Sequence, residues 1–339
     1  TANWGNHCYI SENYHKLDNF NELFANRKAL PTTFNDIQNR LESKILSKKV
    51  SKFYQSHKNS KIKLIQAAFQ LLILSDNSNE KTHYTYYGRK KLKVLLSEIN
   101  NSIKRWYRKK YIDQNFLQEI IDDKSFIFLP LQQEPERSLL LSAPDYKNQI
   151  ETVEYVSKCM PENFLLLVKE HPTQGSGRDW RKISQYKAIQ NNSNVRLIHP
   201  SVSADEIIKK SKLVISVSGT IALESAFFNK PSITIADNDY SLIPSISRLN
   251  SKNELRELIE NSLEQKIDPS IIGKYIDILE ENSFIFDHLG FQISYFEHFY
   301  FGGNLVDVEI SESHMKEFLV KKQNLENLAQ EFKKKMIKN

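Results

Sequence analysis

Glycine is scarce in this sequence, with nine residues in 339, where average usage would give about two dozen. The phosphate-binding motifs G-x-x-x-x-G-K-[ST] and G-x-G-x-x-G do not occur, since Gly175-Ser-Gly177 lacks the third glycine of the second motif. These absences exclude a P-loop nucleotide hydrolase and a standard dinucleotide-binding enzyme.

Cysteine and long apolar runs are also few. The two cysteines, Cys8 and Cys159, fit neither a disulfide framework nor a thiolate metal cluster, so a reducing, cytoplasmic compartment is expected. The longest apolar run, 64–74, is interrupted by Gln66 and Gln70, and it is shorter than the roughly 20 residues that a membrane-spanning helix needs. No transmembrane helix is therefore expected.

The composition is that of a folded, soluble chain, with 40% hydrophobic and 26% charged residues. A length of 339 residues favours two domains, or one domain with a large appendage. The sequence begins Thr-Ala-Asn, without an initiator Met or a signal-peptide pattern. Whether residues upstream of Thr1 are missing is left open.

Positive charge is concentrated in the first third of the chain. Residues 1–120 contain 21 Lys and Arg against 10 Asp and Glu, whereas the remainder contains 26 against 31. Within 89–110 there are nine basic residues and one acid, Glu98. Such a cluster indicates an anionic partner, namely membrane headgroups, nucleic acid or a phosphorylated substrate.

The basic cluster has the periodicity of an amphipathic helix over 91–107. One helical face carries Leu92, Leu95, Leu96, Ile99, Ile103 and Trp106, and the other carries Lys91, Lys93, Lys104, Arg105 and Arg108. The pattern predicts peripheral binding to an anionic membrane surface at the inner face of the cytoplasmic membrane. The alternative is that the apolar stripe packs against a tail helix over 313–338.

A nucleic-acid-binding protein is the third hypothesis for this region, with aromatic side chains as stacking groups: Tyr84, Tyr86, Tyr87, Trp106 and Tyr107. Helical periodicity is not typical of a stacking platform, so no nucleic-acid partner is expected.

After Ser125, short apolar runs alternate with amphipathic segments. Strands are predicted at 126–130, 164–168, 195–198, 213–216 and 232–236, and helices at 146–160, 180–189, 204–211, 220–229 and 253–264. This alternation predicts an α/β fold with a parallel sheet covered on both faces. We expect a Rossmann-like domain at 121–265, preceded by a mostly helical basic segment at 1–120 and followed by a helical region at 266–339.

Polar clusters follow three of the predicted strands. They are 130–137, which contains Gln132, Glu134 and Glu136; Lys169-Glu170-His171-Pro172; and Ser216-Val-Ser218-Gly219-Thr220, followed by Glu224. In open parallel sheets ligands bind at the carboxyl ends of the strands, so these clusters are the candidate site.

The third cluster has the chemistry of an anion site, because a strand leading through Ser218-Gly219-Thr220 into a helix presents backbone N–H groups and hydroxyls. The alternative is that Ser218 or Thr220 merely caps the helix. Glu224, one turn further on, could reach a ribose diol; the alternative is a solvated helix residue.

His171 follows a buried strand with charged neighbours, and it could donate a hydrogen bond to a phosphate or act as a general acid. The alternative is a structural histidine at a strand end. His199 ranks second because no acid lies near it in the sequence. No residue spacing suggests a metal site, and Asp237-Asn238-Asp239 is better interpreted as a turn.

Four ordered segments resemble the motifs of bacterial capsule and surface-polysaccharide biosynthesis proteins. They are Phe128-Leu-Pro-Leu-Gln-Gln-Glu-Pro-Glu-Arg137, Val168-Lys-Glu-His-Pro172, Val195-Arg-Leu-Ile198, and Ser218-Gly-Thr-Ile-Ala-Leu-Glu-Ser225 with Lys230-Pro231. These are GT-B glycosyltransferases similar to capsule Kdo transferases and, more distantly, to bacterial sialyltransferases. The resemblance covers about 125–250.

The resemblance implies that this segment is the donor-nucleotide half, the C-terminal half, of a two-domain, metal-independent glycosyltransferase. The donor would be a nucleotide-activated sugar, with a CMP-linked acidic sugar such as Kdo as one candidate, and the acceptor a glycan or glycolipid. The donor is a substrate, and no cofactor is implied. By this analogy His171 is catalytic, and the donor is bound by Lys169, Glu170, Ser218, Gly219, Thr220 and Glu224, with Gln132, Glu134 and Glu136 in the cleft.

Two departures from the family pattern limit the transfer of roles. Relatives have an N-terminal Rossmann domain for the acceptor, and 1–120 is too short and too poor in strands to form one. Residues 221–223 are Ile-Ala-Leu, where relatives often have small residues and an aromatic. A nonenzymatic sugar-nucleotide-binding subunit, or an inactive remnant, is therefore the alternative function.

Overall fold

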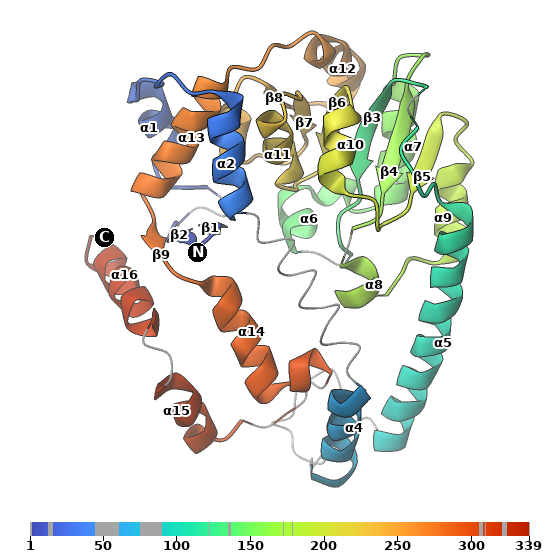
Figure 1. The fold of residues 1–339 in the computed structure, drawn as a ribbon, viewed down its shortest axis with the longest axis vertical. Helices are drawn as coiled ribbons and strands as arrows, with labels where there is room; N and C mark the ends of the chain where they lie inside the picture. The colour runs from blue at the N-terminus through green and yellow to red at the C-terminus, as the bar shows by residue number, and fades with distance from the viewer. Residues whose placement is uncertain are drawn as a thin grey trace.

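A six-stranded parallel sheet forms the centre of the molecule (Figure 1). The computed structural model describes residues 2–12, 16–44, 61–74, 90–121, 123–134, 137–171, 173–177, 179–304, 308, 310–320 and 324–338. The strands are β3 (Phe126–Pro130), β4 (Leu165–Lys169), β5 (Val195–Ile198), β6 (Leu213–Ser216), β7 (Ser232–Thr234) and β8 (Ile246–Arg248), in the spatial order β5-β4-β3-β6-β7-β8.

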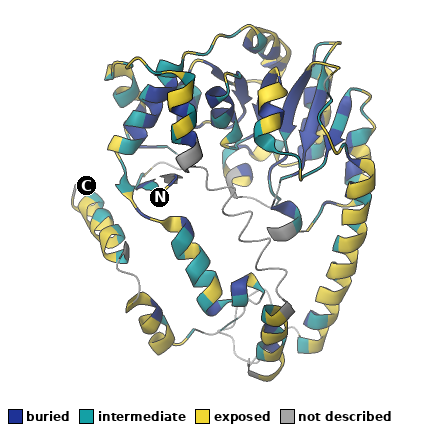
Figure 2. Cartoon of the chain, viewed as in Figure 1, coloured by how far each residue is buried: buried dark blue, intermediate teal, exposed yellow. Residues whose placement is uncertain are grey.

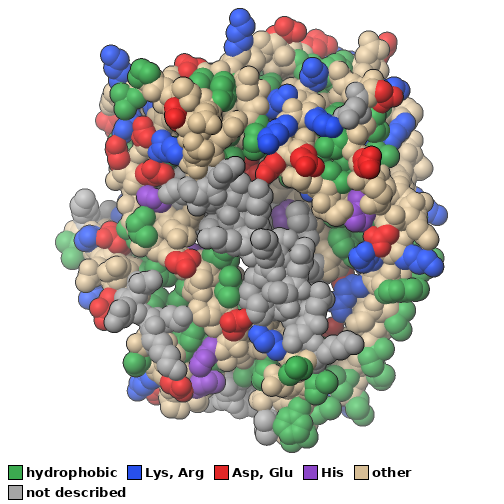
Figure 3. Space-filling view, in the orientation of Figure 1, with side chains coloured by type: hydrophobic (Ala, Val, Ile, Leu, Met, Phe, Trp, Pro, Cys, Tyr) green, Lys and Arg blue, Asp and Glu red, His purple; other side chains and the backbone are tan. Residues whose placement is uncertain are grey.

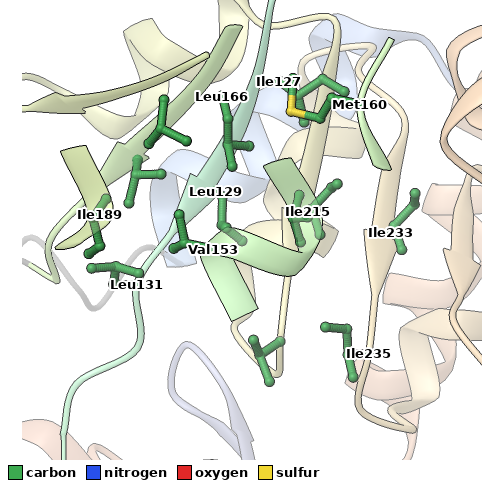
Figure 4. Close-up of a cluster of buried hydrophobic side chains, with 14 of the residues drawn as sticks. Ile127, Leu129, Leu131, Val153, Met160, Leu166, Ile189, Ile215, Ile233 and Ile235 are labelled. Carbon is green, nitrogen blue, oxygen red and sulfur yellow. The ribbon is translucent and has the colours of Figure 1, made fainter. Parts of the chain in front are cut away.

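Helices cover both faces of this sheet, as its mostly apolar central strands β3, β4 and β6 require. One face carries α7 (Gln149–Cys159), α9 (Ile183–Gln190) and α12 (Leu255–Leu263), and the other carries α10 (Ala204–Lys210) and α11 (Ile221–Phe227). Side chains of a strand alternate between faces, so Ile127 and Leu129 pack in the first layer whereas Phe126 and Phe128 pack in the second. Figure 4 shows the first of these clusters, with Val153 and Met160 against the strands. The α/β prediction is confirmed.

The predicted elements of this domain agree closely with the structure. Strands β3, β5 and β6 have the predicted bounds, and the other predicted elements shift by a few residues at their ends. Strand β8 was not predicted, because Ile246-Ser-Arg248 is short and has a single apolar residue.

Residues 2–12 and 16–44 pack beside the sheet domain. Helices α1 (Phe20–Asn26) and α2 (Phe34–Lys44) share a buried cluster with α11 and with α13 (Pro269–Glu281). Strands β1 (Ala2–Trp4) and β2 (His7–Tyr9) form a small antiparallel sheet with β9 (Phe284–Ile285). The predicted division at 120 and 265 stays a prediction, and packing contacts cross both boundaries.

A second group of helices lies below the sheet domain in Figure 1. It comprises α4 (Lys61–Phe69), η1 (Gln70–Leu74), α5 (Lys91–Asn115), α14 (His288–Phe299), η5 (Phe301–Gly303), α15 (Glu312–Val320) and α16 (Asn324–Lys338). The remaining short elements are α6 (Arg137–Ser142), η2 (Pro144–Tyr146), α8 (Gln174–Gly177), η3 (Asp239–Leu242) and η4 (Lys252–Glu254). Among the helices that the structure describes, none is both long enough and apolar enough to cross a bilayer.

Candidate functional site at the carboxyl edge of the sheet

The chain reverses its direction of travel across the sheet between β3 and β6. It proceeds from β3 to β4 and β5 on one side and then from β6 to β7 and β8 on the other. Such a switch point opens a crevice at the carboxyl ends of the strands. The segments that follow β3, β4 and β6 are the three polar clusters of the sequence, and β3 pairs directly with both β4 and β6.

Gln132, after β3, lies against Gly219, after β6. A Cβ atom added to Gly219 would lie 3.1 Å from the Gln132 Nε2 and 3.1 Å from the Ser216 Oγ. The Gly219 N–H donates to Ser216 Oγ at 3.0 Å, and its carbonyl accepts from the Tyr240 hydroxyl at 3.2 Å. Two hydrogen bonds therefore fix the backbone of this turn. Gln132 can approach the turn closely because Gly219 has no side chain.

The two hydroxyls around Gly219 do not cap α11. The Ser218 Oγ is buried and has no hydrogen-bond partner within the described part of the chain. Thr220 stands at the N-cap position without a side-chain cap, and its hydroxyl donates instead to Glu224 Oε1 at 2.8 Å. The capping alternative is therefore wrong. An unpaired buried hydroxyl is costly, which marks Ser218 as a group suited to a ligand.

His171 is held through its Nδ1 atom. The Thr173 N–H donates to Nδ1 at 3.2 Å, and the Thr173 hydroxyl lies 2.9 Å from the same atom. Burial, followed by the nearby Lys169 charge, lowers the pKa of His171 to about 4. The imidazole is thus neutral near pH 7 with its proton on Nε2, which favours the role of hydrogen-bond donor over that of imidazolium acid.

Lys169 ends β4 with its side chain buried. Burial lowers the pKa of Lys169 to about 8, opposed by the charge of Asp205. The ammonium group therefore remains mostly protonated at neutral pH and supplies positive charge beside His171.

Glu170 belongs to a buried ion-pair network. Its Oε2 accepts from Arg181 Nε at 2.8 Å and from the Tyr186 hydroxyl at 2.9 Å, and its Oε1 accepts from the His171 N–H at 3.0 Å. Burial raises the pKa of Glu170, and the charge of Arg181 opposes this. Both carboxylate oxygens have protein partners, so the contact of Glu170 with the donor stays a prediction.

Arg181 joins the loop after β3 to the loop after β4, and sequence reasoning missed it. Its guanidinium contacts Glu170, donates to the Gln132 carbonyl at 2.9 Å, and pairs with Glu134 Oε2 at 2.5 Å. It lies twelve positions after β4, in a segment without a strand-end motif, so the sequence offered no signal that this arginine is buried.

Two glutamines complete the support of the loop after β3. Gln149 binds both backbone groups of Gln132 and donates to Glu134 Oε1 at 2.6 Å. The Gln174 side chain accepts from the Glu134 N–H at 2.9 Å and donates to its carbonyl at 3.2 Å. Glu136 lies outside the described residues.

His199 does have an acidic partner, contrary to the sequence interpretation. Its Nε2 lies 3.0 Å from Asp113 Oδ1, and its Nδ1 lies 2.6 Å from the Ser201 hydroxyl. Asp113 belongs to α5, 86 positions away in the sequence, which is why no local pattern revealed it.

The Asp237-Asn238-Asp239 segment forms a turn into η3. Asp237 pairs with Lys16 at 2.7 Å and with Arg248 at 3.1 Å, and Asp239 accepts from the Leu17 N–H at 2.7 Å. Burial raises the pKa of Asp239 to about 6. These carboxylates fasten the amino-terminal segment to the sheet domain.

The comparisons with known proteins identify the family of the chain. The model of the family described as capsule polysaccharide biosynthesis protein matches residues 40–257, well over half of the sequence. The chain belongs to this family. No curated protein matches the chain.

Solved structures with some similarity are known as well. One is the beta Kdo 2,7 transferase of Thermosulfurimonas dismutans KpsC, with 15% sequence identity and a TM-score of 0.34; the match covers 51% of this chain and 52% of that chain. Another is the beta Kdo 2,4 transferase of the same protein, with 13% identity and a TM-score of 0.34, and here the match covers 64% of this chain and 56% of that chain. A third is the UDP-GlcNAc 2-epimerase of Methanocaldococcus jannaschii, with 14% identity and a TM-score of 0.33; the match covers 52% of this chain and 49% of that chain. The chain spans about half the length of these proteins.

Proposed function

We propose that this chain is a metal-independent GT-B glycosyltransferase that uses a nucleotide-activated sugar to build a capsule or surface polysaccharide or glycolipid. The observation that carries the proposal is the turn after β6, where the Gly219 backbone lies against Gln132 and the buried Ser218 hydroxyl has no partner in the described chain. Membership of the capsule family supports it.

The donor phosphate is proposed to lie between the ends of β4 and β6. These strands flank β3 on its two sides, so the segments that follow them are two strand spacings, about 10 Å, apart. In this arrangement the His171 Nε2–H and the Ser218 hydroxyl donate to phosphate oxygens, and the Lys169 ammonium adds positive charge.

The proposed reaction breaks the bond between the anomeric carbon of the sugar and the donor phosphate as an acceptor hydroxyl attacks that carbon. Negative charge then grows on the departing phosphate. Fixed hydrogen-bond donors stabilise such charge better than water does, because they need no reorganisation. Thr220 is proposed to face the donor phosphate and Glu224 the ribose, with Gln132, Glu134 and Glu136 in the cleft.

A CMP-linked acidic sugar such as Kdo is the proposed donor, and a glycan or glycolipid is the proposed acceptor. We place the protein in the cytoplasm, at the inner face of the cytoplasmic membrane. No cofactor beyond the donor substrate is part of the proposal.

Isothermal titration calorimetry with CMP, UDP and a short oligonucleotide tests the proposal, together with an assay for CMP released from CMP-Kdo. We expect CMP to bind and to be released on turnover. Nucleotide binding without turnover would favour the nonenzymatic binding subunit, and binding of the oligonucleotide alone would refute the glycosyltransferase proposal.

A further inference from the structure

The outward faces of α4 and α5 are apolar and exposed to solvent. Helix α5 is largely exposed along its length in Figure 2, and in Figure 3 hydrophobic side chains gather over α4 and α5 at the lower right and bottom. We call this the α4–α5 surface; it comprises Ile62, Ile65, Phe69, Ile73, Leu92, Leu96, Ile99, Ile103 and Trp106. Leu96 exposes 67% of its surface and Trp106 63%.

The packing of both helices uses their other faces. Ala67 and Leu71 of the α4 segment are buried against Val94 of α5, and Ile112 anchors the far end of α5 in the main core. Between these two points, Arg108 of the inward face donates to the Trp180 carbonyl at 2.5 Å. The exposed apolar stripe is therefore not needed to hold α5 in place.

The alternative that this stripe packs against the tail helix is wrong. Leu92, Ile99 and Ile103 each remain more than half exposed. Helices α15 and α16, which contain the predicted tail stripe, lie on the opposite side of the molecule from α5 (Figure 1).

Basic side chains border the stripe on α5. At about 100° per residue, Lys93 and Lys104 fall on one border of the stripe. The other border is mixed, because Lys91 and Lys109 lie beside Glu98 and Lys109 is paired with Asp113 at 2.6 Å. Lys110 lies over the Trp106 ring, 5.7 Å from its centre. The result is an apolar face with a cationic margin on one side and an aromatic group, the arrangement of helices that lie in a membrane interface.

We propose that the α4–α5 surface docks on an anionic lipid bilayer, with the apolar side chains at the headgroup boundary and the lysines at lipid phosphates. This inference deepens the proposed function, on which it rests, by assigning the surface that meets the membrane carrying a lipid-linked acceptor. A second copy of the chain fits less well, because self-pairing of the surface would bring Lys93 and Lys104 of two chains together.

The docking surface and the candidate site lie toward the same edge of the sheet. After α5 ends at Asn115, the Leu117 N–H donates to the Leu197 carbonyl at 2.9 Å and the His199 N–H donates to the Leu117 carbonyl at 2.8 Å. Helix α5 thus joins the sheet at the carboxyl end of β5 and extends away from it for about 37 Å. The α4–α5 surface therefore extends from the same edge of the sheet at which the candidate site lies.

Sedimentation of the full chain with vesicles tests the proposal. The vesicles are pure phosphatidylcholine, or the same lipid with a third of phosphatidylglycerol, at low and high salt. We expect binding to the anionic vesicles at low salt, reduced at high salt. The stripe variant Leu96→Gln, Ile99→Gln, Ile103→Gln is expected to lose binding. The charge variant Lys93→Gln, Lys104→Gln should weaken it on the order of tenfold.

A matched control removes the same charge elsewhere. Lys158→Gln with Lys266→Gln changes two exposed lysines that lie outside the α4–α5 surface, and its binding should equal that of the parent. Circular dichroism and CMP titration of each variant separate loss of the fold, or failure of the nucleotide site, from loss of docking.

Several results would overturn the proposal. These are absence of binding to either vesicle, equal binding to both, or parental binding by the stripe variant. Dimerisation that the stripe variant abolishes, without vesicle binding, would assign the surface to a second copy. Oligonucleotide binding that the charge variant abolishes, again without vesicle binding, would assign it to nucleic acid.

Discussion

Arg181 and Glu170 form an ion pair whose Nε and Oε2 atoms are 2.8 Å apart, with side chains 3% and 0% exposed. The same guanidinium contacts Gln132 and Glu134. The two loops that carry most of the candidate site are therefore fixed to each other by one buried cation.

Replacement of Arg181 by Met is expected to lower the free energy of unfolding by about 3 to 5 kcal/mol, because the charge of Glu170 would be left buried without its partner. Burial would then raise the pKa of Glu170 further. A carboxyl group whose pKa is raised in the folded state makes the protein less stable as pH rises. The destabilisation caused by Arg181→Met should therefore be larger at pH 8 than at pH 5. Urea unfolding at both pH values measures it.

Arg27→Met is the matched control, since Arg27 pairs with Glu281 at the surface. It should cost about 1 kcal/mol or less. Adding Glu170→Gln to Arg181→Met should restore part of the lost stability. A loss for Arg181→Met no larger than that of the control would show that the buried pair does not hold the loops together.

The sheet domain could be predicted because its elements are defined locally. The run Phe126–Pro130 is apolar throughout, as a strand buried on both faces must be, and it is bounded by polar residues. The positions of Gln132, His171 and Ser218 at one edge followed from the geometry of parallel strands alone.

The residues that hold the site residues in position could not be predicted, because their contacts join segments that are distant in the sequence. Nothing in the local sequence separates the buried Arg181 from the half-buried Arg105 or the exposed Lys182. The partner of His199 is Asp113, in a helix that precedes the sheet domain. Local periodicity placed the apolar stripe of α5, but whether that stripe would be covered depended on where the tail helices pack.

Gly219→Val is expected to weaken nucleotide binding. The added side chain would crowd Gln132 and Ser216, which lie 3.1 Å from the position of its Cβ, and would displace the turn that carries Ser218. Calorimetry with CMP measures the effect. Gly219→Ala adds only the Cβ atom and should weaken binding less than Gly219→Val does. Unchanged CMP affinity in Gly219→Val would remove this turn from the site.

Ser218→Ala should separate binding from stability. The hydroxyl has no partner in the described chain, so its removal should leave the free energy of unfolding unchanged or slightly higher, while CMP affinity falls. Ser216→Ala is the contrasting variant: its hydroxyl accepts the Gly219 N–H, and its loss should cost about 1 kcal/mol. Destabilisation by Ser218→Ala at unchanged affinity would contradict the assignment.

Stability should fall as pH decreases from about 6.5 to about 4, in part because of His171. The unfolded chain binds a proton on this residue near pH 6.5, whereas burial lowers its pKa to about 4 in the folded protein. Over this interval the unfolded state binds more protons, so the free energy of unfolding decreases with falling pH. Urea unfolding at pH 7, 6 and 5 should show that the free energy of unfolding depends less on pH in His171→Gln than in the parent. The same pH dependence in both proteins would show that His171 is not a group whose pKa is lowered by folding.

His171→Ala is expected to abolish transfer while the protein remains folded. The side chain contacts Thr173 through Nδ1, which leaves the Nε2–H to donate to the donor phosphate in our proposal. Loss of one such donor to developing charge typically costs about 3 kcal/mol, or on the order of 100-fold in rate. The CMP-release assay measures the rate, and thermal unfolding checks the fold.

Thr173→Val, which removes the hydroxyl beside Nδ1 and keeps the backbone N–H, should reduce the rate less than His171→Ala does, since it disturbs only the orientation of the ring. Near-parental turnover in folded His171→Ala would exclude His171 from the site, whereas loss of the fold would favour a structural role at the end of β4.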